Sequence, residues 1–218
     1  MATKRRVSKG SQRRHRGARV ETVRRRILDA ALKDFKTKGY SAATIKSISR
    51  RAGVSEQAFA KEFGTKEDVT VYFFEVCARD AMSSVARDTH VRRAPLKEKL
   101  FAIISRQLET LSPHKEIVRE VLAHAWLPTS KLNPLSLESL QLTVDYLTEV
   151  KTIIEQSERT REIPNLGGFG PYVFGLFYLG ILTFWLYDAS KAEEDTLSLL
   201  DQSLNLIFRL LGDPRSGQ

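Results

Sequence analysis

The sequence has very little cysteine, and its histidines are far apart. Cys77 is the single cysteine among 218 residues, so no intramolecular disulfide can form and a reducing, cytoplasmic environment is expected. The four histidines are scattered, and no glycine-rich phosphate-binding loop is present. Glu120 and His124 are spaced to share one helix face, but two potential metal ligands at this spacing often occur by chance. The sequence therefore favours neither an enzyme, a metal site nor a cofactor.

Long uncharged runs are also scarce, and one exception needs an explanation. Residues 169–187 contain no charged side chain over 19 positions, which is the length of a membrane span. Pro171, Gly175 and Gly180 interrupt the run, and an amphipathic helix with four acidic residues follows it. We therefore expect a helix buried between the core of one protomer and a second copy of the chain, rather than a membrane segment. No apolar stretch follows the N-terminal charges closely enough to predict a secretory signal.

Negative charge is almost absent from the N-terminus. Residues 1–26 carry eleven Lys or Arg residues against Glu21 alone, a net charge of +10, whereas the remainder of the chain has a net charge of −1. This distribution suits a polyanion partner, because each phosphate that is neutralised releases a condensed counterion. Residues 1–19 are predicted to form a basic arm, disordered in isolation, that contacts DNA. A solvating tail or a targeting address are the alternatives. The arm residues expected at the DNA are Arg13, Arg14, Arg16 and Arg19.

The rest of the sequence has helical periodicity. Ile27, Ala31 and Phe35 recur every four residues and predict a first helix from about Val20 to Lys38, ended by Gly39. No segment alternates with period two for long enough to predict a strand, so the fold class is all-α, with about nine helices. Ser190 and Glu193 predict a capping box for the last helix. The later helices are expected at Lys66 to about Thr89, Pro95–Leu111, Pro113–Leu127, Pro134–Glu162, Pro171–Asp188 and Lys191–Leu211.

Two short predicted helices, Thr44–Ala52 and Ser55–Glu62, are separated by a tight turn at Gly53. Small residues at this turn let the two helices cross closely, which is typical of a helix-turn-helix. Glu56, Gln57 and Lys61 are then expected to face outward, toward a DNA groove. A generic helical hairpin would explain the same packing, but it would not explain the basic arm beside it.

The run RRRILDAALKDFKTKGYSAATIKSISRRAGVSEQAFAKEFGTKEDV, residues 24–69, resembles the N-terminal domain of TetR-type (TetR/AcrR) transcriptional regulators. The resemblance implies a three-helix helix-turn-helix DNA-binding domain at residues 20–66. It also implies a larger helical effector-binding and dimerisation domain at residues 67–218. The protein is accordingly expected to be a homodimeric DNA-binding regulator, a repressor whose affinity for double-stranded DNA is changed by a small, largely apolar effector.

The resemblance also implies roles for matched residues. Thr44 and Lys46, at the start of the second helix, should meet backbone phosphate. Lys66 should bind phosphate at the N-terminus of the fourth helix, assisted by the helix dipole. The groove-facing start of the recognition helix comprises Ser55, Glu56, Gln57 and Ala58.

Two positions depart from the family pattern. The family usually has a tyrosine and, two positions later, a histidine or tyrosine that contact phosphate, but this chain has Ala60 and Glu62. Alanine donates no hydrogen bond, and a carboxylate repels phosphate. Our preferred interpretation is that the basic arm replaces these contacts by entering the adjacent minor groove, as homeodomain arms do. The competing hypotheses are a ligand- or partner-binding protein that has lost DNA binding and, less favoured, a membrane-surface protein.

The C-terminal domain yields two predicted sets of residues. Gln107 and His124 continue apolar stripes, so each needs a polar partner, which can be protein, water or ligand. For every residue of the predicted effector pocket, the alternative explanation is that it belongs to an ordinary hydrophobic core. The predicted effector pocket comprises Phe101, Ile104, Gln107, Leu108, Leu122, His124, Trp126, Tyr146, Phe174 and Tyr178. The predicted dimer interface comprises Gly175, Gly180, Phe184, Leu197, Leu200, Leu204, Ile207 and Leu211.

Overall fold

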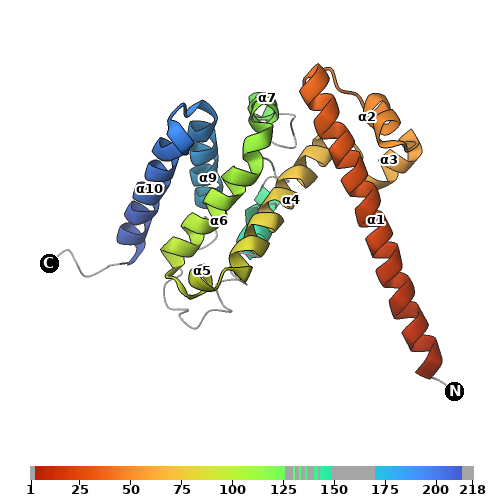
Figure 1. Ribbon diagram of the computed structural model, residues 1–218, viewed down its shortest axis with the longest axis horizontal. Coiled ribbons are helices and arrows are strands. Elements are labelled where there is room, and N and C mark those ends of the chain that lie inside the picture. Colours follow the sequence, from red (N-terminus) through yellow and green to blue (C-terminus); the bar gives the residue numbers. More distant parts are fainter. Residues whose placement is uncertain are drawn as a thin grey trace. The chain divides into compact units, whose positions relative to one another are not determined.

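A computed structural model describes the backbone of residues 3–125, of isolated positions between 130 and 148, and of residues 170–212. Side chains are described within residues 20–125, at those isolated positions and within residues 173–209. The described elements are all helices, which confirms the all-α prediction (Figure 1). The chain divides into two compact units, Met1–Phe73 and Phe74–Gln218.

The N-terminal unit is built from α1 (Thr3–Lys38), α2 (Ile45–Ala52), α3 (Glu56–Glu62) and the first turns of α4 (Lys66–Arg87). The four-residue period of α1 places Ile27, Ala31 and Phe35 in the core, each at most 3% exposed. The helix begins earlier than the sequence predicts, at Thr3 rather than near Val20. Six arginines and two lysines, which favour helix, outnumber Gly10 and Gly17 in this stretch, and it contains no proline to stop a helix.

The turn between α2 and α3 has the expected chemistry. Thr44 caps α2 by accepting a hydrogen bond from the Ser47 amide, and Ser55 caps α3 by accepting one from the Ala58 amide. Gly53 ends α2 with φ of +64°, in the left-handed region that glycine tolerates best. A Cβ atom at Gly53 would also lie 3.2 Å from Nη2 of Arg26. The predicted helix-turn-helix is therefore present.

A buried carboxylate joins α1 to α2. Asp34 is 0% exposed, and its oxygens accept hydrogen bonds from Nε of Arg51 at 2.7 Å, Nζ of Lys38 at 3.1 Å and the Ser47 hydroxyl. Burial alone would raise the pKa of Asp34, but these donors outweigh it and hold the pKa below its usual value. A charged Asp34 therefore fixes both the position and the rotation of α2 on α1.

The C-terminal unit contains the rest of α4 and a layer of helices beyond it. These are α5 (Thr89–Arg93), α6 (Leu96–Leu111), α7 (Lys115–Ala125), α9 (Gly170–Tyr187) and α10 (Glu194–Gly212). In this unit α10 packs on both α6 and α9, and α7 packs on α9 (Figure 1). One core cluster joins Ala78, Met82 and Val85 of α4 to Leu96 and Ile103 of α6.

The sequence predicted most of these helices but missed one and misplaced the start of another. The short helix α5 was not predicted; it begins where the Asp88 carboxylate accepts hydrogen bonds from the His90 and Val91 amides. The segment around Pro113 forms a 3-10 turn, so α7 begins at Lys115. Of the helix predicted at residues 134–162, residues 143–148 are helical, and most of the remainder lies outside the described residues.

The predicted capping box of the last helix is wrong. Glu193 has φ of +60°, so it belongs to a turn, and α10 starts at Glu194. Asp188 takes over the capping role: its carboxylate accepts hydrogen bonds from the Ser190 amide and from the amide and hydroxyl of Thr196. Hydrogen bonds from Ser190 and Thr196 hold the pKa of Asp188 well below its usual value. The connection between α9 and α10 is therefore fixed by a charged carboxylate.

The uncharged run at residues 169–187 largely coincides with α9. Within the part of the chain that the structure describes, no helix is long and apolar enough to cross a membrane. Trp185, Ile181 and Leu182 of α9 are buried within the protomer, at 0–3% exposure.

The Asp34 arrangement predicts an acid-sensitive N-terminal unit. Replacing Asp34 with asparagine should lower the free energy of unfolding at pH 7 by about 3 kcal/mol, because it removes a buried charge from its charged donors. Since the folded-state pKa of Asp34 is depressed, its stabilising contribution is present above its unfolded-state pKa of about 4 and lost as the pH falls further. The stability gap between the wild-type protein and D34N should therefore narrow between about pH 5 and pH 3 in urea titrations. The control D29N removes an exposed carboxylate from the same helix and should leave stability nearly unchanged; an equal loss in D29N, or a constant gap at every pH, would contradict this reading.

Candidate nucleic-acid interface

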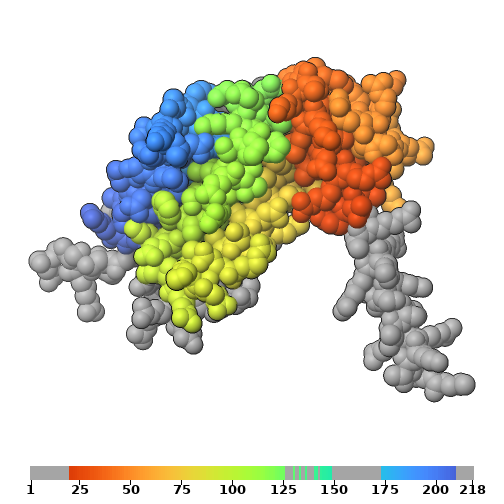
Figure 2. All heavy atoms as spheres, viewed as in Figure 1, coloured from red at the N-terminus to blue at the C-terminus, as the bar shows by residue number. Residues whose placement is uncertain are grey.

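The N-terminal unit exposes one side of α3 and buries the other. Phe59 is 0% exposed and anchors the helix, with its ring centroid 5.9 Å from that of Phe63. Ser55, Glu56, Gln57 and Lys61 are exposed, whereas Ala58 is half-buried. Both α2 and α3, coloured orange in Figure 2, lie at the surface of this unit. The first turns of α3 thus present short and long polar side chains on a rigid helix, which is the arrangement that reads base edges in a major groove.

The helix caps retain hydrogen-bonding capacity. The oxygen of the exposed Thr44 hydroxyl accepts a hydrogen bond from the Ser47 amide at 3.1 Å, and that of Ser55 accepts one from the Ala58 amide at 3.1 Å. A hydroxyl has one proton to donate besides its two acceptor positions. Both caps can therefore donate to a phosphate oxygen while they hold their helices.

Basic side chains flank this surface. Lys46 and Arg50 of α2 and Lys61 of α3 are all exposed. Arg50 was not among the predicted DNA contacts, although its position one turn after Lys46 was a usable signal, because residues four apart share a helix face. Residues 44–62 contain four basic and two acidic residues, a net charge of +2. The local charge is thus only weakly attractive to phosphate.

Lys66, which is predicted to bind phosphate, is hydrogen-bonded within the unit in the free protein. Its ammonium donates to the carbonyl oxygens of Tyr40 at 2.8 Å, Ser41 at 3.2 Å and Ala43 at 3.4 Å, and it lies 4.6 Å from the Tyr40 ring centroid. An ammonium has three protons, so these bonds leave none for a phosphate. The side chain instead holds the loop between α1 and α2, where the carbonyl groups have no helical partner.

The N-terminus of α4 is also satisfied internally. The Asp68 carboxylate accepts a hydrogen bond from the Thr65 amide at 2.8 Å, and the Thr65 hydroxyl accepts one from the Asp68 amide at 3.2 Å. This reciprocal pair is a capping box, and it places a negative charge at the helix end. Together with Lys66, it makes this end of α4 part of the scaffold.

The last arginines of the basic N-terminal segment are used inside the unit. The Arg24 guanidinium lies 4.1 Å from the Tyr72 ring centroid and 4.8 Å from that of Phe63. Nη2 of Arg26 donates to the Ala52 carbonyl at 2.7 Å, at the C-terminus of α2. These arginines lock α1 to its neighbours. The side chains of Arg13, Arg14, Arg16 and Arg19 lie outside the described residues.

The predicted effector-pocket residues fall into separate groups. The rings of Tyr146 and Phe174 are stacked with centroids 5.7 Å apart, and Tyr178 lies 6.4 Å from Tyr146. On α6, Ile104, Gln107 and Leu108 are at most 3% exposed. Leu122 is half-buried, His124 is hydrogen-bonded through Nδ1 to the Glu120 carbonyl at 2.7 Å, and Trp126 lies outside the described residues.

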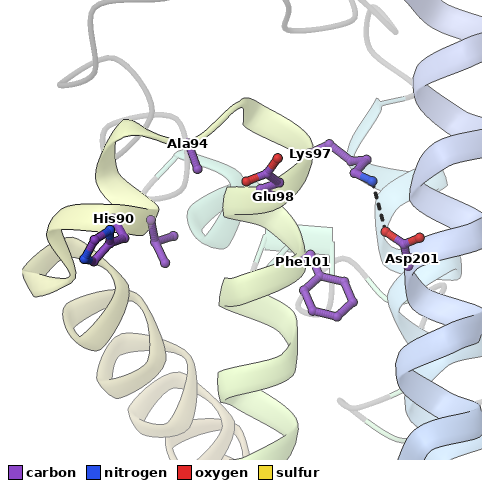
Figure 3. Close-up of a pocket in the computed structure, with 7 residues that line it drawn as sticks. His90, Ala94, Lys97, Glu98, Phe101 and Asp201 are labelled. Atoms are coloured by element: carbon purple, nitrogen blue, oxygen red, sulfur yellow. Dashed lines mark hydrogen bonds and ion pairs between the residues drawn. The ribbon is translucent and has the colours of Figure 1, made fainter.

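Phe101 lies apart from this aromatic group, in a cavity of about 340 Å³ that sequence reasoning missed (Figure 3). Lys97 at its wall donates to Oδ1 of Asp201 and to Oδ1 of Asn205, both at 3.0 Å, and so joins α6 to α10. Among the described residues, no cluster of three His, Cys, Asp or Glu side chains is arranged to hold a metal ion. The cavity is lined by His90, Val91, Ala94, Lys97, Glu98, Phe101 and Asp201.

Several predicted dimer-interface residues lie inside the protomer. Leu200 and Leu204 are at most 1% exposed, and a Cβ atom at Gly175 would lie 3.4 Å from Oγ1 of Thr143 in the same chain. Leu200 and Leu204 are buried because α10 packs on α6 and α9 within one chain. Leu197 and Ile207 are half-buried, and the side chain of Leu211 lies outside the described residues.

A different face of α9 is exposed. Phe184 is 43% exposed, and a Cβ atom at Gly180 would meet no atom within 4 Å, so these two predicted residues do face outward. The same face includes Val173, Leu176 and Tyr187, which are 48%, 55% and 72% exposed. These residues recur every three or four positions, which places them on one stripe of the helix. An exposed stripe without charge is typical of a protein interface.

Comparison with known proteins agrees with this architecture. Residues 27–71 match the model for bacterial regulatory proteins of the tetR family, and residues 99–214, more than half of the chain, match the tetracyclin repressor-like C-terminal domain. The HTH-type transcriptional regulator SrpR of Pseudomonas putida is 24% identical over 202 residues, covering 92% of this chain and 91% of that protein. The uncharacterized HTH-type transcriptional regulator YvkB of Bacillus subtilis is 29% identical over 165 residues, covering 72% and 82%.

Solved structures have the same fold. A TetR transcriptional regulator from Nitrosomonas europaea matches with a TM-score of 0.63 and 18% identity, covering 84% of this chain and 96% of that chain. Thermus thermophilus FadR, a TetR-family transcriptional repressor, matches with a TM-score of 0.55 and 20% identity, covering 89% and 99%. The chain therefore belongs to the TetR family of transcriptional regulators and has a DNA-binding helix-turn-helix domain at its N-terminal end.

Proposed function

We propose that this protein is a homodimeric repressor that binds a specific DNA operator and is released by a small, largely apolar effector. The observation that carries the proposal is the exposed side of α3, where Glu56, Gln57 and Lys61 project from a helix anchored by the buried Phe59. A two-fold dimer would present two such helices to two half-sites of one operator. Base contacts from α3 would specify the sequence, and phosphate contacts would fix the register.

The phosphate contacts of this proposal come from three places. The hydroxyls of Thr44 and Ser55 and the exposed side chains of Lys46 and Arg50 supply donors beside α3. Ala60 and Glu62 supply none, and Lys66 is engaged by loop carbonyls. The basic arm, residues 1–19 with eight Lys or Arg side chains, therefore provides the largest reserve of positive charge. In the proposal it makes the contacts that α3 and α4 lack.

A second candidate function is a ligand-binding protein of the same fold without specific DNA binding. It is favoured by the end of α3, where the exposed Ala60 donates nothing and the half-buried Glu62 adds negative charge. The exposed Gln57, one turn before Ala60, and the exposed Lys61 favour the repressor. The repressor would bind one specific DNA sequence, whereas the second candidate would bind none.

The dimer of the proposal forms through α9. Its exposed uncharged stripe, from Val173 to Tyr187, includes Gly180, where a partner helix could approach closely. The neighbouring helix α10 adds Leu206, which is 58% exposed. Burying this apolar surface against a second copy would stabilise the dimer in proportion to the area removed from water.

Support for an effector comes from the C-terminal unit. An aromatic group lies next to the core between α4 and α6 and comprises Tyr146, Phe174 and Tyr178. The hydroxyls of its two tyrosines are buried. The similarly folded FadR of Thermus thermophilus was solved in complex with lauroyl-CoA. In the proposal, the effector binds one conformation preferentially and so lowers the affinity for DNA. Bound DNA lowers the affinity for the effector by the same factor.

The arm can be tested by its salt dependence. We expect a variant with the eight Lys and Arg residues of positions 1–19 replaced by glutamine to bind a duplex from the protein's own upstream region much more weakly. The slope of log K against log salt should flatten by several units per dimer, because each phosphate contact contributes about 0.9. Fluorescence anisotropy at four or five salt concentrations measures the slope.

The matched control for the arm is Q57A. This change should weaken discrimination between the duplex and a scrambled one and leave the slope unchanged, because base contacts release few counterions. A slope that glutamine substitution of the arm does not alter would show that the arm makes no phosphate contact. No preference for the upstream duplex over the scrambled one would favour the second candidate function.

The dimer can be tested on the exposed stripe of α9. The double variant L176E/F184E places two buried charges in the proposed interface, and it should give monomers at micromolar concentration, as measured by light scattering. A glutamate at Leu204 would not be a useful test, because that side chain is buried within the protomer. The control S112E adds a charge at an exposed position outside α9 and should remain dimeric. A dimeric, folded L176E/F184E protein would refute the interface.

A further inference from the structure

Five buried polar side-chain atoms in the C-terminal unit have no hydrogen-bond partner in the part of the chain that the structure describes. Two of them are Nε of Arg119 and Nε1 of Trp185, and the other three bear on a ligand. These three are the hydroxyls of Tyr146 and Tyr178 and Oε1 of Gln107. Gln107 as a whole is 3% exposed. Buried polar groups are nearly always hydrogen-bonded, and leaving one unpaired destabilises the fold. Such atoms need a partner, which a buried water or a bound ligand can supply.

The two tyrosines belong to one neighbourhood, and Gln107 lies on a face of α6 that borders it. The rings of Tyr146 and Tyr178 are 6.4 Å apart, and Tyr146 packs against the core cluster that contains Ile103 of α6. Gln107 lies one helical turn after Ile103 and so shares its face of α6. On the other side, Phe174 stacks on Tyr146 with a centroid distance of 5.7 Å. Polar atoms from α6, α9 and residues 143–148 are thus embedded among aromatic and aliphatic side chains.

The neighbourhood is uncharged. Burial raises the pKa of both tyrosines above 10, so each hydroxyl is protonated at neutral pH and can donate and accept a hydrogen bond. No charged residue occurs in α9. Lys99 of α6 is buried on the same side of its helix, but it lies two turns, about 12 Å, before Gln107. Among the described residues of α9 and the aromatic group, a ligand beside the tyrosines would therefore meet neutral donors and acceptors.

We propose that the effector of this protein is an uncharged, aromatic amphiphile whose hydroxyl group hydrogen-bonds to the Tyr146 and Tyr178 hydroxyls. The inference rests on the proposed effector response and narrows its chemistry. The aromatic rings of Tyr146, Phe174 and Tyr178 take the apolar body of the ligand by stacking. Oε1 of Gln107 can only accept, so it favours a ligand with a proton to donate. A carboxylate is disfavoured, because burying an anion without a cationic partner costs far more than burying a neutral hydroxyl.

The probes are three compounds with the same apolar body: 4-butylphenol, butylbenzene and 4-butylbenzoate. Isothermal titration calorimetry on the full-length protein should give 4-butylphenol an affinity about tenfold higher than butylbenzene, the gain expected when unpaired buried groups are satisfied. We expect 4-butylbenzoate to bind more weakly than both. In the Y146F/Y178F variant the preference for the phenol over butylbenzene should disappear.

The same variant has a second, ligand-independent readout. Because the two hydroxyls are unpaired in the free protein, Y146F/Y178F should melt at the same temperature as the wild-type protein or higher. A hydroxyl that merely stabilised the fold would give the opposite shift. The control S112A removes a hydroxyl at an exposed position at the end of α6, away from the stripe of α9, and should alter neither the melting temperature nor the preference for the phenol.

Several results would overturn the inference. If 4-butylphenol and butylbenzene bind equally well, water satisfies the hydroxyls and the inference fails. It also fails if 4-butylbenzoate binds most tightly or if no probe binds. A lower melting temperature of Y146F/Y178F would contradict it as well. Operator binding by the ligand-free protein, measured in parallel, separates these results from failure of the proposed function. Loss of the phenol preference with intact operator binding rejects the ligand class alone. A phenol preference without operator binding rejects the repressor and leaves the ligand site.

Discussion

The buried carboxylate of Asp34 is the interaction on which the arrangement of the N-terminal unit depends. It receives hydrogen bonds from Ser47 and Arg51 of α2 and from Lys38 of its own helix, so α2 can occupy only one position on α1. Gly53 then sets the direction of α3, and Arg26 closes the C-terminus of α2. The exposed face of α3 is therefore defined by contacts made well inside the unit. Its rigidity matters because side chains on a fixed helix lose less entropy when they bind bases.

The basic side chains of the N-terminal unit divide into those that hold the helices together and those that are exposed to bind DNA. The division depends on whether each side chain already has a hydrogen-bond or aromatic partner inside the unit. Lys66 is committed to loop carbonyls and Arg24 to aromatic rings, whereas Lys46 and Arg50 are exposed. The chain thus uses much of the basic charge around its helix-turn-helix to hold the helices together. Phosphate binding must rely on the remaining exposed residues and, in our proposal, on the N-terminal arm. In the C-terminal unit the corresponding division is between apolar side chains: α9 is uncharged, and it has one side buried in the protomer and one exposed stripe.

Local rules predicted the parts of the structure that depend on neighbours in sequence. The caps at Thr44 and Ser55, the left-handed Gly53 and the core positions of α1 follow from residue type and helical period. Contacts between distant residues were not predictable: nothing near Asp34 in the sequence identifies Ser47 and Arg51 as its partners, and Lys66 is bonded some 25 residues away. Leu200 and Leu204 illustrate the same limit, because an apolar stripe fits a protomer core and a dimer interface equally well. The capping box at Ser190 failed because Asp188 accepts from the Ser190 amide, and because the Ser190 hydroxyl accepts from the Asp195 amide instead of the Glu193 amide.

The central claim is that α3 of a two-fold dimer reads DNA sequence. Selection of bound duplexes from a random-sequence library by the full-length protein, followed by sequencing, tests this claim directly. The account predicts enrichment of one two-fold symmetric site, with Q57A changing the preferred base at the same position in both half-sites. Failure to enrich any motif, or a motif that Q57A and K61A both leave unchanged, would contradict it.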